Sequence, residues 1–150
     1  MFRMAPYKKH YLTDVEVKVT VGIRTNEDGV DKNQFFSLKL DISKANTLTL
    51  NWTLVHVVDE DSPFYSLTEE EILQLKPELL VFVKGYDDEY SNTVIARTSY
   101  TYREFIFGAK FTQMFQLSED RQHTIMDLNK LNAYEKAALP KLTYSQNLIE

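Results

Sequence analysis

The chain contains no cysteine, which excludes disulfide bonds and thiolate metal sites and is compatible with a reducing compartment. Glycine and proline are scarce at four each, so flexible linkers and low-complexity tracts are not expected. The longest apolar run, 79–83, has five residues, whereas a membrane-spanning helix needs about twenty. The first residues also lack the apolar stretch of a signal peptide. Taken alone, the chain is expected neither to cross a membrane nor to be exported.

The remaining composition is that of a folded domain. The chain has 150 residues, of which 43% are hydrophobic and 26% charged, enough for one domain with a proper core. The net charge of -5 favours solubility and argues against a nucleic-acid partner.

Alternating hydrophobicity predicts a largely β structure. From Asp14 to Arg24, five β-branched residues alternate with polar ones, which is typical of a strand with one buried face. A polar turn over Thr25–Lys32, centred on Asp28-Gly29, should lead to a partner strand at Phe36–Asp41. Further strands are expected at 47–58 with a kink near residue 51, at 78–84, at 93–100, and in a hairpin over 110–116 and 122–128.

One helix is expected at Leu67–Leu75, because Thr68 followed by Glu71 forms a capping-box pattern and Pro77 stops the helix. A single helical turn is expected near 103–107. The pattern predicts an all-β fold, an immunoglobulin-like β-sandwich with one or two short helices, spanning 1–150 as a single domain. The sandwich would occupy 14–128 between a linker, 1–13, and a tail, 129–150, with mild helical character up to Ala138.

The residues do not indicate an enzyme. The three histidines lack metal-ligand spacing, and His56, within a predicted strand, is better explained as a structural residue. The acidic run Asp59–Asp61 lacks the calcium-loop pattern, so a solvated strand end or a capping role is favoured. Nucleophile and phosphate-loop motifs are missing from the sequence. No cofactor or metal is expected.

The segment 51–65, NWTLVHVVDEDSPFY, is similar to the W-T-x-x-H-x-I-D-x-x-S-P stretch of inward-rectifier potassium channels. In the family this stretch is followed by a short helix, an apolar strand that ends in glycine, and the motifs A-R or C-R, S-Y and E-I-x-W-G. The corresponding segments occur here in the same order, at 67–75, 79–85, 96–97, 99–100 and 104–108. The start, Arg3-Met4-Ala5 followed by Lys8, Leu12 and Asp14, is similar to the pattern that begins the family's cytoplasmic domain. The chain thus resembles the C-terminal cytoplasmic domain of a bacterial-type member, with departures at Pro6, Phe107 and Ala109.

The resemblance implies a homotetramer that extends a potassium pathway into the cytosol, below a transmembrane pore region that this chain lacks. The residues it places along the ion pathway are Asp14, Gly85, Tyr86, Asp87, Asp88 and Ser91. At about 6 Å in water each Asp14 carboxylate would attract a cation by roughly 0.7 kcal/mol, and four by about 3 kcal/mol before screening. Alternatively, Asp14 merely starts a strand and the acidic turn is merely solvated.

The resemblance also implies contact with anionic membrane lipid through Arg3, Lys8 and Lys9, by roughly 1 kcal/mol for each base. Lys84 stands where strongly rectifying relatives have an acid, which predicts weak block by polyamines. Such a domain would lie at the cytoplasmic face of the cell membrane as part of the full channel.

A second interpretation is a free-standing immunoglobulin-like adaptor or ligand-binding module. Tyr86, Tyr90 and Tyr102 would then form an aromatic platform for a peptide or a sugar. Symmetry separates the two interpretations, because only the channel domain is expected to form a four-fold assembly.

Overall fold

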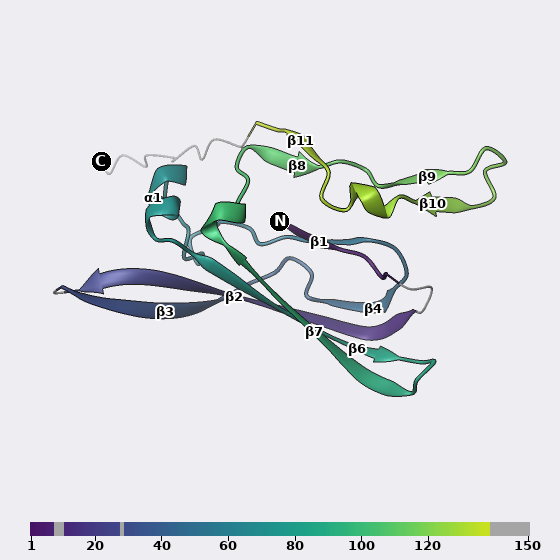
Figure 1. The fold of residues 1–150 in the computed structure, drawn as a ribbon, viewed down its shortest axis with the longest axis horizontal. Helices are drawn as coiled ribbons and strands as arrows, with labels where there is room; N and C mark the ends of the chain where they lie inside the picture. Colours follow the sequence, from purple (N-terminus) through teal and green to yellow (C-terminus); the bar gives the residue numbers. More distant parts are fainter. Residues whose placement is uncertain (8–10, 28, 139–150) are drawn as a thin grey trace, which may run out of the picture. The chain divides into compact units, whose positions relative to one another are not determined.

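A computed structural model describes residues 1–7, 11–27 and 29–138 (Figure 1). The chain divides into two compact units, Met1–Phe105 and Ile106–Glu150.

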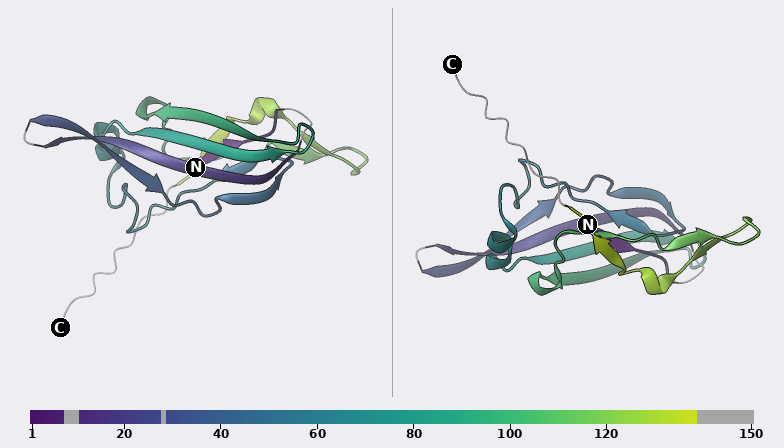
Figure 2. Two further views of the ribbon diagram at one scale, coloured as in Figure 1. Left: turned by 90° about the horizontal axis from the view of Figure 1, so that it is seen from below. Right: turned by 90° about the horizontal axis from the view of Figure 1, so that it is seen from above.

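The first unit is built on one long strand. Strand β2 (Leu12–Glu27) is antiparallel to β3 (Val30–Leu38) and to β6 (Glu78–Asp87), and its first residues also pair with β4 (Lys44–Leu48). Strand β7 (Asn92–Thr101) pairs with β6. The result is a five-stranded antiparallel sheet in which β2, β6 and β7 run side by side (Figure 2).

The alternation in β2 decides which face of this sheet is buried. Val15, Val17, Val19, Val21 and Ile23 are each at most 5% exposed. They point to one face because successive side chains of a strand alternate. The predicted half-buried strand is confirmed, and it supplies half of the buried core of this unit.

A second, smaller sheet packs on that core. Strand β1 (Phe2–Met4) pairs with β5 (Trp52–Leu54), and side chains of both strands pack against the buried cluster. The Phe2 ring also lies 5.5 Å from the Tyr100 ring of β7, centroid to centroid. The predicted class is confirmed as an all-β sandwich, and β1 falls in the segment expected to be a linker.

The predicted helix is α1 (Glu69–Gln74), and its capping box is present. The Thr68 backbone N–H donates to Glu71 Oε2 at 2.7 Å, and the Glu71 N–H donates to Thr68 Oγ1 at 3.3 Å. These two bonds satisfy donors that the first helical turn leaves unpaired. The predicted helical turn near 103–107 is the short 3-10 helix η1 (Tyr102–Glu104).

The second unit contains two short antiparallel pairs. Strand β9 (Phe115–Leu117) pairs with β10 (Thr124–Met126), as the predicted hairpin requires. Strand β8 (Ala109–Phe111) pairs instead with β11 (Tyr134–Lys136), joined across the pair by a Lys110–Glu135 ion pair of 3.1 Å. A 3-10 helix, η2 (Leu128–Lys130), follows β10.

Two expectations were wrong in detail. The turn expected over 25–32 is shorter, because β2 and β3 stay paired up to Glu27 and Val30; Gly29, just before β3, adopts a φ of 78°. The expected helical character of 129–138 is limited to η2, and β11 follows it as a strand. Residues 139–150 lie outside the described residues.

The capping box predicts a pH-dependent stability difference. Hydrogen bonds from the Thr68 backbone and side chain hold the pKa of Glu71 below its ordinary value. A depressed pKa contributes stability above the ordinary glutamate pKa and loses it as the pH falls through the folded-state value. Glu71→Gln should therefore be less stable than the unsubstituted chain at neutral pH, and the gap should close in acid, as measured by urea unfolding.

The matched control is Glu70→Gln, which makes the same charge change in the same helical turn outside the capping box. A gap for Glu71→Gln that is constant from neutral to acidic pH would contradict the assignment.

Candidate functional site

The residues predicted for the ion pathway gather at one end of the large sheet. Leu12 lies opposite Asp87, and Thr13 lies opposite Tyr86, so the start of β2 adjoins the β6–β7 turn. The Thr13 hydroxyl donates to the Tyr86 carbonyl at 3.5 Å. The register between β2 and β6 then shifts between Thr13 and Glu16, where Asp14 lies.

Asp14 occupies this irregularity as an exposed residue with a φ of 48°. A left-handed backbone at a bulge re-aims the side chain relative to the strand on either side. Aspartate tolerates this conformation better than most residues. Asp14 thus interrupts the regular alternation of β2. The sequence pattern did not predict this interruption.

The loop expected over 85–92 is shorter than predicted. Strand β6 runs to Asp87 and β7 starts at Asn92, which leaves a four-residue turn, 88–91. Asp88 and Ser91 are exposed in this turn, and Ser91 has a φ of 48°. Strands β6 and β7 stay paired up to Asp87 and Asn92, farther than predicted, because Asp87 closes the turn.

Asp87 is 8% exposed. Its Oδ1 accepts hydrogen bonds from the Glu89 N–H at 3.0 Å and from the Tyr90 N–H at 3.2 Å. A carboxylate that satisfies two turn N–H groups stabilises the turn and is turned away from solvent. In this chain Asp87 therefore positions the turn.

Gly85 is also buried. It lies within β6 without a positive φ, so the backbone freedom predicted for it is not used. A Cβ atom at this position would lie 3.4 Å from Leu12 Cβ and 3.4 Å from Val15 Cγ2. Strand β2 therefore packs against Gly85 closely enough that an added methyl group would be in van der Waals contact with it.

Tyr86 lies between these two buried residues and points to the opposite, solvent-facing side of the sheet, where it is 38% exposed. Lys84 is exposed on the same side. Glu16 lies across the strand from Lys84, and its Oε1 is 3.8 Å from Lys44 Nζ of β4. Of the six pathway residues, Asp14, Tyr86, Asp88 and Ser91 are exposed and Gly85 and Asp87 are buried.

Of the three predicted lipid-binding residues, the structure describes only Arg3. Arg3 lies in the middle of β1 and is 6% exposed. Burial lowers the pKa of its guanidinium, which nevertheless stays charged. Arg3 is thus buried in the first unit, where a lipid-binding residue was expected to be exposed. Lys8 and Lys9 lie outside the described residues.

His56 has the structural role predicted for it. Its Nδ1 lies 2.7 Å from the Lys39 carbonyl, and its Nε2 lies 2.8 Å from Ser62 Oγ. Because a carbonyl only accepts, Nδ1 carries the proton in the neutral ring and Nε2 accepts from the Ser62 hydroxyl. Ser62 Oγ in turn accepts from the Phe64 N–H at 3.2 Å. These bonds tie the segment after β5 to the segment after β3.

Asp59 has the predicted capping role, because its Oδ1 accepts from the Asp61 N–H at 3.2 Å. Across residues 1–7, 11–27 and 29–138, histidine and acidic side chains form no group of three that could hold a metal ion. In the same ranges no helix is both long and apolar enough to span a membrane.

The aromatic residues of the adaptor interpretation do not form one platform. Tyr86 and Tyr90 adjoin the β6–β7 turn, whereas Tyr102 follows the other end of β7. Glu78 lies opposite Thr101, the neighbour of Tyr102, and Tyr86 is eight steps along β6 from Glu78, or about 26 Å. Tyr102 is instead engaged by Arg103, whose Nε donates to the tyrosine oxygen at 3.3 Å and lowers its pKa.

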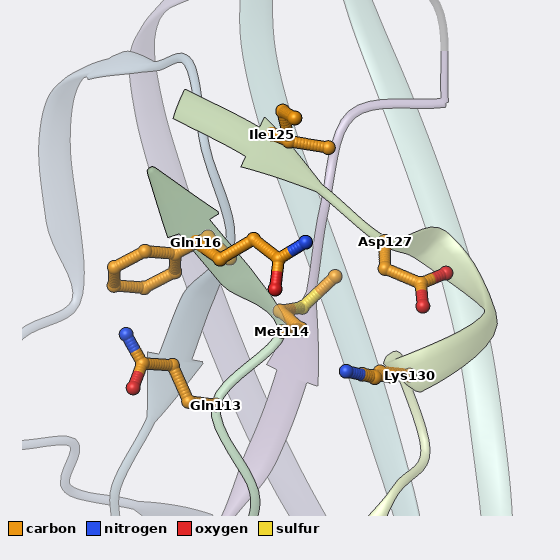
Figure 3. Close-up of a pocket in the computed structure, with 7 residues that line it drawn as sticks. Gln113, Met114, Gln116, Ile125, Asp127 and Lys130 are labelled. Carbon is orange, nitrogen blue, oxygen red and sulfur yellow. The ribbon is translucent and has the colours of Figure 1, made fainter. Parts of the chain in front are cut away.

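A pocket of about 270 Å³ lies in the second unit, beside β9, β10 and η2 (Figure 3). Met114, Gln116 and Ile125 contribute to its lining, together with Asp127 and Lys130. The Asp127 carboxylate accepts from the Asn129 N–H at 3.0 Å, so it serves the η2 turn. No pattern in the amino-acid sequence indicated this pocket.

Within the described residues, the fold is all-β, and the residues predicted for the ion pathway lie together at one end of its large sheet. The chain matches the family described as the inward rectifier potassium channel C-terminal domain over residues 1–148. It belongs to this family, which is a family of channel domains and not of enzymes.

Individual relatives agree with this assignment. The chain is 29% identical over 133 residues to inward rectifier potassium channel Kirbac3.1 of Paramagnetospirillum magnetotacticum, covering 88% of this chain and 45% of the relative. It is 32% identical over 88 residues to human inward rectifier potassium channel 4, covering 58% and 19%. It is 26% identical over 118 residues to inward rectifier potassium channel irk-1 of Caenorhabditis elegans, covering 75% and 22%. The chain therefore spans less than half the length of these relatives.

The burial of Asp87 predicts a stability role that its neighbour lacks. Asp87→Ala should lower the free energy of unfolding by about 1–3 kcal/mol, because two turn N–H groups lose a charged acceptor. Asp88→Ala, an exposed neighbour with the same charge, should change it by less than about 0.5 kcal/mol. Urea unfolding of both variants checks this, and equal effects would show that Asp87 does not hold the turn.

Proposed function

We propose that this chain is the cytoplasmic regulatory and ion-pathway domain of an inward-rectifier potassium channel. Four copies would surround a vestibule below the membrane pore, at the cytoplasmic face of the cell membrane, and couple lipid or cytosolic signals to gating. The observation that carries the proposal is the family match over residues 1–148. The pore region, which conducts potassium in this proposal, would be supplied outside the chain.

The pathway wall would be formed by the sheet end at the β6–β7 turn. Asp14, Tyr86, Asp88 and Ser91 are exposed there and would line the pathway. Gly85 and Asp87 would act from behind them, by close packing and by holding the turn. Four-fold symmetry would repeat each exposed carboxylate four times, which raises the local potassium concentration without selecting potassium over sodium.

Lipid coupling would use the N-terminal bases. Lys8 and Lys9 would contact anionic head groups directly, by roughly 1 kcal/mol each. Arg3, which is buried in β1, would anchor the segment that carries them. The chain's net charge of -5 favours an inorganic cation over nucleic acid as a partner.

A chimera tests the proposal. The pore region of the bacterial relative Kirbac3.1 would be joined to this chain and reconstituted in liposomes, and rubidium uptake measured. The proposal predicts a tetramer that takes up rubidium. Asp14→Asn should reduce uptake at low ionic strength and much less at high ionic strength, because salt screens exposed charges.

The control is Asp41→Asn, which removes one exposed carboxylate from the loop after β3. If the tetrameric chimera conducts and both variants reduce uptake equally, Asp14 has no special place on the pathway. A chimera that fails to form a tetramer would contradict the proposed assembly itself.

A further inference from the structure

The solvent-facing side of the large sheet carries a cluster of positive charge that the family match does not explain. Lys18 of β2 lies opposite Phe82 of β6, and Phe82 lies opposite Arg97 of β7. Lys84 is two residues from Phe82 and shares its face. All three cations are on the side opposite the buried valines of β2, and all three are exposed.

The three cations are close enough to bind one ligand together. Neighbouring strands lie about 4.8 Å apart, so Lys18 and Arg97 are separated by about 10 Å across Phe82. Lys84 lies about 7 Å along β6 from the same phenylalanine. Their long side chains can therefore converge over the Phe82 ring.

Arg97 contacts the aromatic ring at the centre of the cluster. Its guanidinium carbon lies 5.6 Å from the centroid of the Phe82 ring, a cation–π arrangement. A guanidinium held over one ring face can still donate through its N–H groups to a planar or tetrahedral oxyanion. Less conformational entropy is then lost when such a ligand binds.

The cluster carries more positive than negative charge. Glu16 lies directly opposite Lys84, but its carboxylate is 3.8 Å from Lys44 Nζ of β4, so this one acid faces a further cation as well. In the part of the chain that the structure describes, no hydrogen bond or ion pair engages the ammonium group of Lys18 or Lys84. This face is therefore cationic in a chain whose net charge is -5.

We propose that Lys18, Lys84 and Arg97 form a binding site for a soluble multivalent phosphate anion. One exposed ion pair contributes only about 0.2–1 kcal/mol in water, so a monovalent anion would not be held. A chain of phosphates can engage all three cations at once, and the arginine fork provides bidentate contacts. This site goes beyond the proposed channel function, and its binding step does not depend on that function.

Calorimetric titration of the full chain with inorganic tripolyphosphate tests the proposal. Saturable binding is expected, with an affinity that falls as ionic strength rises. Lys84→Gln and Lys18→Gln should each weaken binding about five-fold, and Arg97→Gln about ten-fold. Arg97→Lys should fall between the unsubstituted chain and Arg97→Gln, because it keeps the charge and loses the fork.

The matched control is Lys110→Gln, an exposed lysine of β8 in the second unit, which should leave the affinity unchanged. Absence of binding, or equal weakening by the control, would overturn the proposal. Binding to anionic vesicles but not to tripolyphosphate would assign the face to a membrane instead. Self-association abolished by Lys84→Gln would assign it to a second copy. Each of these two results would also overturn the proposal. The outcome of the titration does not depend on rubidium uptake by the chimera.

Discussion

The structure of the first unit depends on the burial of one row of β-branched side chains along β2. This strand pairs with β3, β4 and β6, so it fixes the register of most of the large sheet. Each buried aliphatic side chain contributes on the order of 1.5–3 kcal/mol. A slip by one residue would move the whole row to solvent and the polar residues into the core. The small β1–β5 sheet covers this same row.

The regularity of β2 ends where function is proposed. The register shift beside Asp14 breaks the alternation at the sheet end that also carries Tyr86 and the 88–91 turn. Buried groups behind this end, Gly85 and Asp87, hold it in place. Farther along, the same solvent-facing side becomes cationic around Phe82. The sheet thus has the exposed carboxylates of Asp14 and Asp88 at this end and cations in the middle of its solvent-facing side, an arrangement that would oppose strong polyamine binding in the proposed vestibule.

Local patterns predicted the elements that local physics determines. The alternation in β2 and the Thr68–Glu71 capping box are both present, because each depends on residues close in sequence. Strand β11 and the burial of Arg3 could not be predicted, since both depend on pairing with distant segments. The cross-strand row Lys18–Phe82–Arg97 could not be predicted from the sequence either. Each strand alone shows only a polar or apolar residue, and the register brings the three together.

The central claim is that the solvent-facing sheet end at Tyr86 lines an ion pathway. This chain has no cysteine, so a single Tyr86→Cys substitution introduces one thiol into this part of each copy of the conducting chimera. A charged thiol reagent added from the cytosolic side should reduce rubidium uptake through this variant, and Leu50→Cys, exposed elsewhere in the first unit, should be unaffected. Modification of Tyr86→Cys without any change in uptake would contradict the account.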